Sequence, residues 1–492
     1  MDDTIKKTFD LASFEQASKK MISANMAGFS KYGYTTNFKL KDYKPEEIQL
    51  IIASGDVRKQ RELSRNYFYK DGFYKRILLY YATLLKYNGI LIPNPAIGQN
   101  LSTPSIAKRY YGAVNFVEKM HLPQLLTHCS LNALIYGSYF GVIQTINKNE
   151  FVLLDLPSTY CYSRLKDVQG NDIIEFDVSY FNTILDESYR KETLALYPKE
   201  IRNYYRRWVN GKVSTSLMVI PSDIGVCFMF TDGRPLFLNV IPATLQYEEA
   251  VETERERDLE EIRKIIVQKI PHLQDGGLLF EPQEAAVIHE GTVGMMKQNK
   301  NVSILTTYAD VDAIVSKTTS DAVSNNLEKM VQNIYYEGGV TSQLFAATGN
   351  MALSTSIKND MAMMMMLGNK YSSFISGAVN RLYANTAIDF KYTVLPITYY
   401  NEDDYISSTF KLAQSGYSLI LPALACDLSQ RDINNVKDLE NDLLKLGDKF
   451  KPLGSAYTQS ANSPGRPALD DEDKSPKTIA NEVSLDKQGG SE

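Results

Sequence analysis

The pattern of apolar and polar residues is clearest between Asp312 and Asn385, where it predicts two long helices joined by a loop. Gly338-Gly339 ends the first helix, and the segment Val340 to Asn350 has no apolar period, which indicates an irregular loop. One face of the first helix is apolar and needs a partner to cover it, as shown by Val323, Leu327, Met330, Val331 and Ile334.

Helical patterning resumes at about Ala352 and continues to Asn385. Met363 to Met366 place flexible apolar side chains on every side of this helix, and Gly368 and Gly377 predict bends. At ~1.5 Å per residue the helix would span roughly 50 Å, which exceeds the width of a small domain. A helical hairpin in the core of one domain is the plain alternative, whereas the length favours burial by more than one subunit.

The chain before this stretch reads as helices followed by antiparallel strands. We expect helices at Pro45 to Ser54, at Val57 to Tyr87, which is rich in tyrosine, and at about Pro123 to Tyr136. The expected strands follow Gly137, with turns at Asn147 to Asn149 and Gln169 to Asn171, and continue at Ser214 to Ile220 and Val226 to Phe230.

A charged helix is expected from Thr244 to Ile270, with Leu259, Ile262, Ile266 and Ile270 on one stripe and Pro271 at its end. The helix from Asp312 to Tyr336 has a similar length. Between them, Pro271 to Val311 contains three β-like runs, GGLLF, AAVIHEG and NVSILTTY. This order predicts a stalk of two helices with a small mixed α/β cap.

The C-terminal part is expected to contain a strand, two helices and a tail. The strand is Asp389 to Tyr399, Asn401 caps a helix with an acidic first turn, and a second helix covers about Ser429 to Lys445. From Ser455 onward, large apolar residues are almost absent, so we expect disorder there.

Composition limits the classes of partner. The chain has 492 residues, 44% of them hydrophobic, and a formal net charge of −5. It lacks the basic footprint of a protein that grips nucleic acid, so any contact with DNA is expected to be local or weak. Its 32 tyrosines suit extensive subunit contacts.

The cysteines and the apolar runs indicate the cellular compartment of the protein. Cys129, Cys161, Cys227 and Cys426 are scattered among apolar or aromatic neighbours, which predicts reduced, buried thiols. The start has no apolar run of signal-peptide length, and Ile77 to Ile92 is too short to span a bilayer. We expect a soluble, intracellular product.

Motifs for catalysis, metals or cofactors are absent from the sequence. It has no phosphate loop, no HExxH and no GxSxG, so we predict a protein that is not an enzyme and holds no metal or cofactor. His121 and His128 are expected to be ordinary packing residues. The trio Glu402, Asp403 and Asp404 could bind a divalent ion, but a solvated helix start is favoured. The cluster Tyr204 to Trp208 could stack on bases, but a helix end packed on a sheet is favoured.

With these elements in place, the chain resembles the portal proteins of tailed bacteriophages, of the kind found in long-tailed phages of Gram-positive hosts. The resemblance covers roughly residues 45 to 450. It rests on DLPSTYCYSRLKDVQGNDIIEFDVSYF, on DGRPLFLNVIPATLQYEEAVE entering the charged helix, on NVSILTTYADVDAI, and on the loop before the Met-rich helix.

The resemblance implies an α+β portal fold built from a wing, a two-helix stem, a small α/β clip, a kinked long helix with a tunnel loop, and a helical crown. The implied segments are an N-terminal arm (1–45), the first part of the wing (46–243), a stem helix (244–270), the clip (271–311), a second stem helix (312–337), the tunnel loop (338–351), the kinked long helix with a wing strand (352–398), the crown (399–454) and a disordered tail (455–492).

The resemblance also implies a function. Copies of the chain would form a ring, usually a dodecamer, at one capsid vertex of the virion after assembly in the host cytoplasm. Double-stranded DNA would enter through the ring during packaging and leave during ejection. The implied partners are the large terminase subunit, a head-to-tail adaptor protein, and the major capsid and scaffolding proteins, with no membrane.

Two sets of site residues follow from the resemblance. The DNA-proximal tunnel loop would present Thr341, Ser342, Gln343, Leu344, Phe345 and Asn350, with Lys358 as the nearest cation. The clip docking surface would present Glu281, Glu290, Lys297 and Lys300. The alternative to a portal is an intracellular helical scaffold or adaptor without a DNA role, and a nucleic-acid-processing enzyme is disfavoured by the missing motifs.

Overall fold

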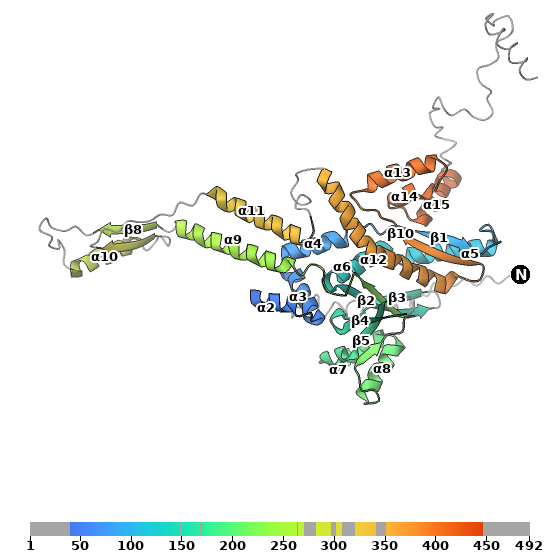
Figure 1. Cartoon of the computed structure of the whole chain (residues 1–492), viewed down its shortest axis with the longest axis horizontal. Helices are drawn as coiled ribbons and strands as arrows, with labels where there is room; N and C mark the ends of the chain where they lie inside the picture. The colour runs from blue at the N-terminus through green and yellow to red at the C-terminus, as the bar shows by residue number, and fades with distance from the viewer. Residues whose placement is uncertain are drawn as a thin grey trace, which may run out of the picture. The chain divides into compact units, whose positions relative to one another are not determined.

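The computed structural model describes residues 40–147, 150–167, 170, 172–262, 264–269, 282–296, 302–307, 320–340 and 351–445. Within these ranges the chain is an α+β protein, as expected (Figure 1). Its contacts divide it into two units, Met1–Arg431 and Asp432–Glu492.

The first described elements are mostly helical. They are α2 (Pro45–Ala53), α3 (Val57–Lys70), α4 (Gly72–Ala82), β1 (Gly89–Pro95), α5 (Pro104–Lys119) and α6 (Leu122–Tyr136). The predicted helical segment from Val57 to Tyr87 contains two helices, because the Asp71 side chain accepts hydrogen bonds from the Phe73 and Tyr74 N–H groups and so starts α4 anew. The predicted end at Tyr87 is wrong, since α4 ends at Ala82. The apolar pattern did not predict β1 or α5.

The end of α6 confirms the predicted stop at Gly137. This residue has φ 77°, and a Cβ atom there would lie 2.2 Å from the Arg234 carbonyl carbon. Only glycine fits both the left-handed backbone and the close approach.

The predicted antiparallel strands are confirmed. They form two three-stranded sheets, in the orders β3-β2-β7 and β4-β5-β6. The strands are β2 (Ser138–Asn147), β3 (Glu150–Asp155), β4 (Cys161–Lys166), β5 (Asp172–Asp177), β6 (Leu217–Val219) and β7 (Gly225–Met229). With α7 (Glu187–Leu196) and α8 (Lys199–Val209) they enclose a separate core around Phe176 and Phe181.

The charged helix is shorter than predicted. α9 (Val240–Ile262) ends eight residues before the expected Ile270, and β8 (Lys264–Lys269) replaces its last part. The run Ile265, Ile266 and Val267 is β-branched, which favours a strand. The apparent helical stripe through Ile266 was therefore misleading.

The cap between the two long helices is a β-α-β unit of β8, α10 (Pro282–Met296) and β9 (Val302–Thr307), in which β8 and β9 pair in parallel. The NVSILTTY strand is confirmed, whereas AAVIHEG lies in α10 and its predicted β character is wrong. Pro282 at the first position and Glu284 in the first turn favour the helix. A parallel pair also needs a connection of this kind.

α11 (Ser320–Glu337) lies beside α9 (Figure 1). Among the residues whose burial is described, both helices reach the main core at one end, through Val240 and Ile241 at the start of α9 and Ile334 and Tyr335 near the end of α11. The Phe73 ring of α4 contacts Tyr335 and also Tyr247 of α9, at centroid distances of 6.0 and 5.4 Å. The Phe73 side chain therefore packs against both α9 and α11 where these helices meet the main core.

The predicted Met-rich helix is α12 (Met351–Tyr383), assigned as one helix through Gly368 and Gly377. It packs on β10 (Ile388–Val394), which pairs antiparallel with β1. Three polar side chains spaced four residues apart bind the β10 backbone: Ser372 accepts from the Val394 N–H, Ser376 from the Tyr392 N–H, and Asn380 pairs with both backbone groups of Phe390. This side of α12 is therefore fixed by hydrogen bonds as well as by apolar packing.

The remaining helices are α13 (Glu402–Gln414), α14 (Ile420–Ala425) and α15 (Gln430–Asp438). The predicted helix Ser429 to Lys445 is α15 followed by a π-helical turn, Leu439–Leu443. Asn401 occupies the position before α13, but it does not cap the helix. Its side chain instead accepts from the Thr398 N–H and donates to the Pro396 carbonyl, because the preceding turn competes for the amide.

Candidate functional site

Most residues of the predicted tunnel loop and clip docking surface lie outside the described residues. These are Thr341, Ser342, Gln343, Leu344, Phe345 and Asn350 of the loop, and Glu281, Lys297 and Lys300 of the clip. Lys358 lies on α12 and Glu290 on α10, and both are exposed. The structure therefore describes the supports of the loop and one helix of the cap.

The segment 341–350 begins where α11 ends against α4. The Gly338 N–H donates to the Ile334 carbonyl at 3.1 Å, and the Val340 N–H donates to the Tyr335 carbonyl at 2.9 Å. Gly339 has φ 66°, and a Cβ atom on Gly338 would lie 2.9 Å from Cδ1 of Ile77. The predicted helix end at these two glycines is confirmed, and Val340 is buried immediately after it.

The residues before and after this segment meet at two tyrosines of α4. The Tyr81 hydroxyl lies 3.3 Å from the Gly338 carbonyl oxygen and 3.4 Å from Oδ1 of Asp360 on α12. The Tyr80 hydroxyl donates to Oδ2 of Asp360 at 2.9 Å. Gly338 and Asp360 are thus held beside the same hydroxyl group.

Burial sets the electrostatics of this anchor. Asp360 is only 3% exposed, and desolvation raises the pKa of its carboxyl group despite the hydrogen bonds from the two tyrosines, which act to lower it. Desolvation, followed by the Asp360 charge, raises the pKa values of Tyr80 and Tyr81. Both hydroxyls therefore keep their protons and act as donors to the carboxylate.

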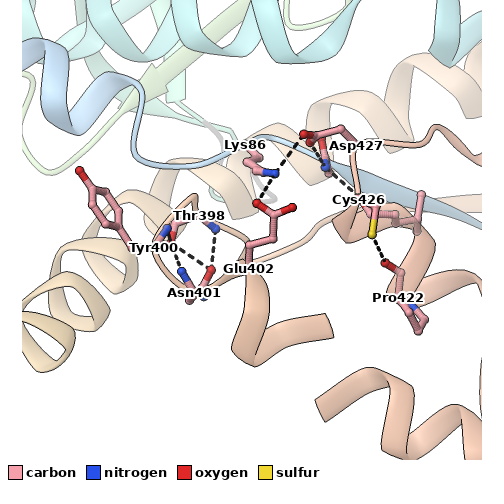
Figure 2. Close-up of polar contacts among 10 residues, drawn as sticks. Lys86, Thr398, Tyr400, Asn401, Glu402, Pro422, Cys426 and Asp427 are labelled. Atoms are coloured by element: carbon pink, nitrogen blue, oxygen red, sulfur yellow. Dashed lines mark hydrogen bonds and ion pairs between the residues drawn. The ribbon is translucent and has the colours of Figure 1, made fainter. Parts of the chain in front are cut away.

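A second anchor joins the segment after α4 to the elements after β10. The Lys86 side chain is 2% exposed, and its ammonium lies 2.7 Å from Glu402 of α13 and 3.0 Å from Asp427 after α14 (Figure 2). Burial acts to lower the pKa of Lys86, but the hydrogen bonds to these two carboxylates outweigh it and raise the pKa. Asn88 also donates to Asp427, whose pKa is lowered because Asn88 and Lys86 together outweigh its desolvation.

This arrangement bears on the acidic trio Glu402, Asp403 and Asp404. All three lie in the first turn of α13, as the solvated-helix-start interpretation requires, and Glu402 also pairs with Lys86. Among the described residues, no group of three His, Cys, Asp or Glu side chains is arranged to hold a metal ion.

The basic aromatic cluster, Tyr204 to Trp208, belongs to α8, and its aromatic rings pack within the protein. Tyr205 is buried and donates to Asn182, while the Tyr204 hydroxyl donates to the Leu217 carbonyl of β6 at 2.8 Å. The favoured prediction of a helix packed on a sheet is confirmed, because Tyr204, Tyr205 and Trp208 pack on the core that contains Phe176 of β5 and Met218 of β6.

The prediction that both histidines are ordinary packing residues fails at His121, which is exposed. His121 precedes α6 with φ 47°, whereas His128 lies within α6 and is 2.6 Å from Asp155. Desolvation acts to lower the pKa of His128, but Asp155 outweighs it and raises the pKa. Tyr139 also donates to Asp155, so His128 belongs to a packed hydrogen-bond network.

The predicted burial of the cysteines is confirmed at two of the four positions. Cys129 and Cys161 are buried, Cys227 is half-buried, and burial raises the pKa values of all three thiols. Cys426 is exposed, so its predicted burial is wrong: the short helix α14 ends there, and its apolar neighbours Leu424 and Ala425 are buried instead. In the described part of the chain, no helix is both long and apolar enough to cross a membrane.

Comparison with known protein families gives no match, and comparison with curated proteins gives no match either.

Sequence reasoning missed Tyr80, Tyr81, Asp360 and Lys86 as anchors. The available signal was weak: Lys86 interrupts an apolar run, and Asp360 precedes the methionines of α12. A charge inside an apolar stretch indicates a buried partner, but it does not say which one.

Proposed function

We propose that this chain is the subunit of a ring-shaped portal through which double-stranded DNA enters and leaves the capsid of a tailed bacteriophage. The observation that carries the proposal is the order of elements from α9 to β10. Two adjacent helices are joined through a small β-α-β unit, and the long helix α12 that follows is held at Asp360 by the same tyrosine that contacts Gly338.

The first support is the surface of α9. Most of its side chains from Gln246 to Glu256 are exposed or half-exposed, and the helix carries eight Asp or Glu residues against two Arg. DNA affinity grows with each phosphate contact made by Lys or Arg, so an acidic helix holds DNA weakly. A conduit needs this property because tight contacts would slow translocation.

The second support is the segment 341–350, our proposed tunnel loop. It contains no Lys or Arg, and the Tyr81 hydroxyl contacts Gly338 before it and Asp360, within α12, after it. Such a loop would act on DNA through shape, while its supports stay in place. Lys358 on the following helix remains the nearest cation in the proposal.

The third support is the β8-α10-β9 unit, our proposed clip. Gln283, Glu284 and Glu290 on α10 are exposed, so this small unit presents polar groups to a partner. In the proposal it meets the terminase during packaging and the head-to-tail adaptor afterwards, with the rest of the ring contacting capsid and scaffolding proteins.

The loop assignment is tested by packaging assays with Gln343→Lys and with a variant lacking residues 343–347. Gln343→Lys adds one cation per subunit around the channel, so we expect slower packaging and more salt-dependent DNA retention. Gln343→Asn, which adds no charge, is the matched control. Wild-type packaging and retention in both test variants, with intact rings, would remove this segment from the DNA path.

The clip assignment is tested by Glu290→Lys, which should leave rings intact and weaken terminase or adaptor binding. Glu187→Lys is the control, because Glu187 on α7 is also exposed and lies outside the β8-α10-β9 unit. Equal binding by the two variants would contradict the assignment.

A further inference from the structure

A pocket of about 210 Å³ lies where β1 meets the end of α5, the start of α6 and the segment between α14 and α15. We call it the β1 pocket. Protein cavities of about 150 Å³ bind a molecule of the size of benzene, so the β1 pocket is large enough for a compound of about six non-hydrogen atoms. Its lining residues belong neither to the proposed tunnel loop nor to the proposed clip.

Three residues that line the β1 pocket have a left-handed backbone, which side chains other than glycine seldom adopt. Tyr87, His121 and Asp427 have φ values of 57°, 47° and 60°, and only one further non-glycine residue in the described part of the chain has a positive φ. A Cβ atom in this conformation crowds the next carbonyl oxygen, so glycine would form these turns at a lower cost. Residues held in this way gather at ligand sites, where their side chains have a use.

Two of the three side chains have a structural reason to be present. The Tyr87 hydroxyl lies 2.6 Å from that of Ser130, and Asp427 pairs with Lys86 (Figure 2). His121 differs, because its side chain is exposed and makes no hydrogen bond or ion pair with the residues that the structure describes. The contacts of the fold therefore do not explain why His121 occupies its turn in place of glycine.

A carboxylate without a cation lies at the same pocket. The two Glu118 oxygens are 3.1 and 3.0 Å from the Ser429 hydroxyl, which has one proton to donate. A carboxylate accepts about four hydrogen bonds, so most of the acceptor capacity of Glu118 is left for water or a ligand. Glu118 is half-buried, and within the described residues no Lys or Arg pairs with it. It lies one helical turn before His121, whose N–H donates to its carbonyl at 3.2 Å.

The rest of the wall decides the body of the ligand. No Lys or Arg lines the β1 pocket, so an anion would meet Glu118 without a positive charge to hold it. A carboxylate beside apolar walls favours a ligand with a cationic donor at one end and an aliphatic body. The buried apolar lining residues are Leu91, Val114, Leu122 and Leu424.

We propose that the β1 pocket binds a small primary alkylammonium ion, with its ammonium group at Glu118 and His121 and its aliphatic chain against the apolar walls. In its neutral form an imidazole has one nitrogen that accepts a hydrogen bond, so His121 and Glu118 together offer acceptors to the ammonium N–H groups. The inference stands apart from the proposed function, because it involves neither a ring nor DNA.

Ligand-observed NMR with the full-length protein tests the chemistry of the ligand. The probes are n-butylammonium, 1-butanol and butyrate, which have similar size and different charge. We expect saturable binding of n-butylammonium, much weaker binding of 1-butanol and none of butyrate. No binding of n-butylammonium, or equal binding of 1-butanol, would overturn the proposal.

Glu118→Gln tests the carboxylate, because it removes the charge and keeps an acceptor for Ser429. It should weaken n-butylammonium binding by roughly ten-fold, since a hydrogen bond to a charged group is lost. Glu192→Gln is the matched control, because Glu192 on α7 is exposed and lies outside the pocket. Equal affinities in the two variants would contradict the assignment.

His121→Gly separates binding from folding. Glycine suits the left-handed backbone, so this variant should not lower the midpoint of thermal unfolding, whereas it should weaken n-butylammonium binding several-fold. His121→Asn tolerates the same backbone and keeps an acceptor, so it should retain more of the binding. Wild-type affinity in His121→Gly would remove His121 from the site, and a fall of several degrees in the midpoint would show that its side chain supports the fold instead.

A lysine derivative tests the source of the ammonium group. Nα-acetyl-lysine methylamide carries the same group and chain on a peptide backbone, which the volume of the β1 pocket does not accommodate as a whole. We expect n-butylammonium to bind more tightly than this derivative. Binding of the derivative alone would assign the pocket to a lysine of a protein partner and overturn the proposal of a free amine.

Discussion

α12 and α9, the two longest helices in the described residues, are stabilised in different ways. α12 fully buries Met364, Leu367, Tyr371, Ile375 and Val379 within its own chain. α9 buries its first turn and leaves most of its next residues exposed. The body around α12 can therefore fold from its own contacts, whereas the α9 and α11 pair has surface that contacts within the chain do not cover.

The polar anchors follow the same division. Asp360 and Lys86 lie in the body and have buried hydrogen bonds or ion pairs. The acidic surface of α9 offers charges without such burial. The exposed surface of α9 therefore contributes little to the stability of the fold.

Met364→Ala should give the largest loss of folding stability. Its side chain is fully buried, so truncation leaves a cavity and should cost about 2–5 kcal/mol in denaturant unfolding of the unassembled chain. Met366→Ala, two residues away and 47% exposed, should cost less than about 1 kcal/mol. Equal costs would show that α12 is not buried as described.

Lys86→Ala should give an intermediate loss of about 1–3 kcal/mol, because it leaves Glu402 and Asp427 without their cation. The loss stays below that of a fully buried pair since both acids are partly exposed and can regain water. Lys191→Ala, which breaks the exposed pair with Glu187, should leave the free energy of unfolding nearly unchanged, because water screens that pair.

The Lys86 effect should also depend on pH. The lowered pKa of Asp427 means that its contribution is present above the unfolded pKa and is lost as pH falls through the folded pKa. The raised pKa of Lys86 means that its contribution is lost as pH rises through the folded value. The difference in the free energy of unfolding between wild type and Lys86→Ala should therefore be greatest near neutral pH and should become smaller in acid.

Asp360→Asn should change stability by less than about 1 kcal/mol at neutral pH, because Tyr80 keeps an acceptor. Its clearer effect is on pH dependence. The raised folded pKa of Asp360 makes wild type lose stability as pH rises from the unfolded to the folded pKa, and the variant should not show this loss. If the free energies of unfolding of wild type and Asp360→Asn changed in parallel across mildly acidic pH, burial of the carboxylate would be contradicted.

Val251→Asp on α9 should have the smallest effect on folding, at most about 0.5 kcal/mol, since Val251 is 38% exposed. Its expected effect is on assembly, where it adds a charge to a surface that neighbouring subunits would cover. Light scattering of folded variants measures this directly. If Val251→Asp lowered folding stability strongly but assembled normally, α9 would matter for the fold rather than for assembly, which contradicts the comparison with α12.

Local patterns predicted the elements whose identity is set locally. The helix end at Gly137, the Pro45 helix start, the antiparallel strands and the long α12 all follow from periodicity and turn residues. The β8 strand did not follow, because Ile262 and Ile266 continue a helical stripe while pairing with β9 decides the structure. The pairing of β8 with β9 depends on tertiary structure, which local sequence patterns do not report.

The contacts of Lys86 and Tyr81 could not be predicted from the sequence, because they also join residues that are far apart in the chain. Lys86 meets Asp427 across 341 positions, and Tyr81 meets Asp360 across 279. Nothing near either residue specifies such a partner. The predicted tunnel-loop residues between Val340 and Met351 lie outside the described residues, so their role stays a prediction.

The central claim is that copies of this chain form a closed ring around a channel. Electron microscopy of the purified full-length protein, with two-dimensional class averages, tests it most directly. The account predicts rings of a single symmetry with a central channel, usually a dodecamer if the resemblance to portal proteins holds. Folded monomers or dimers across a broad concentration range would contradict it and favour a scaffold or adaptor.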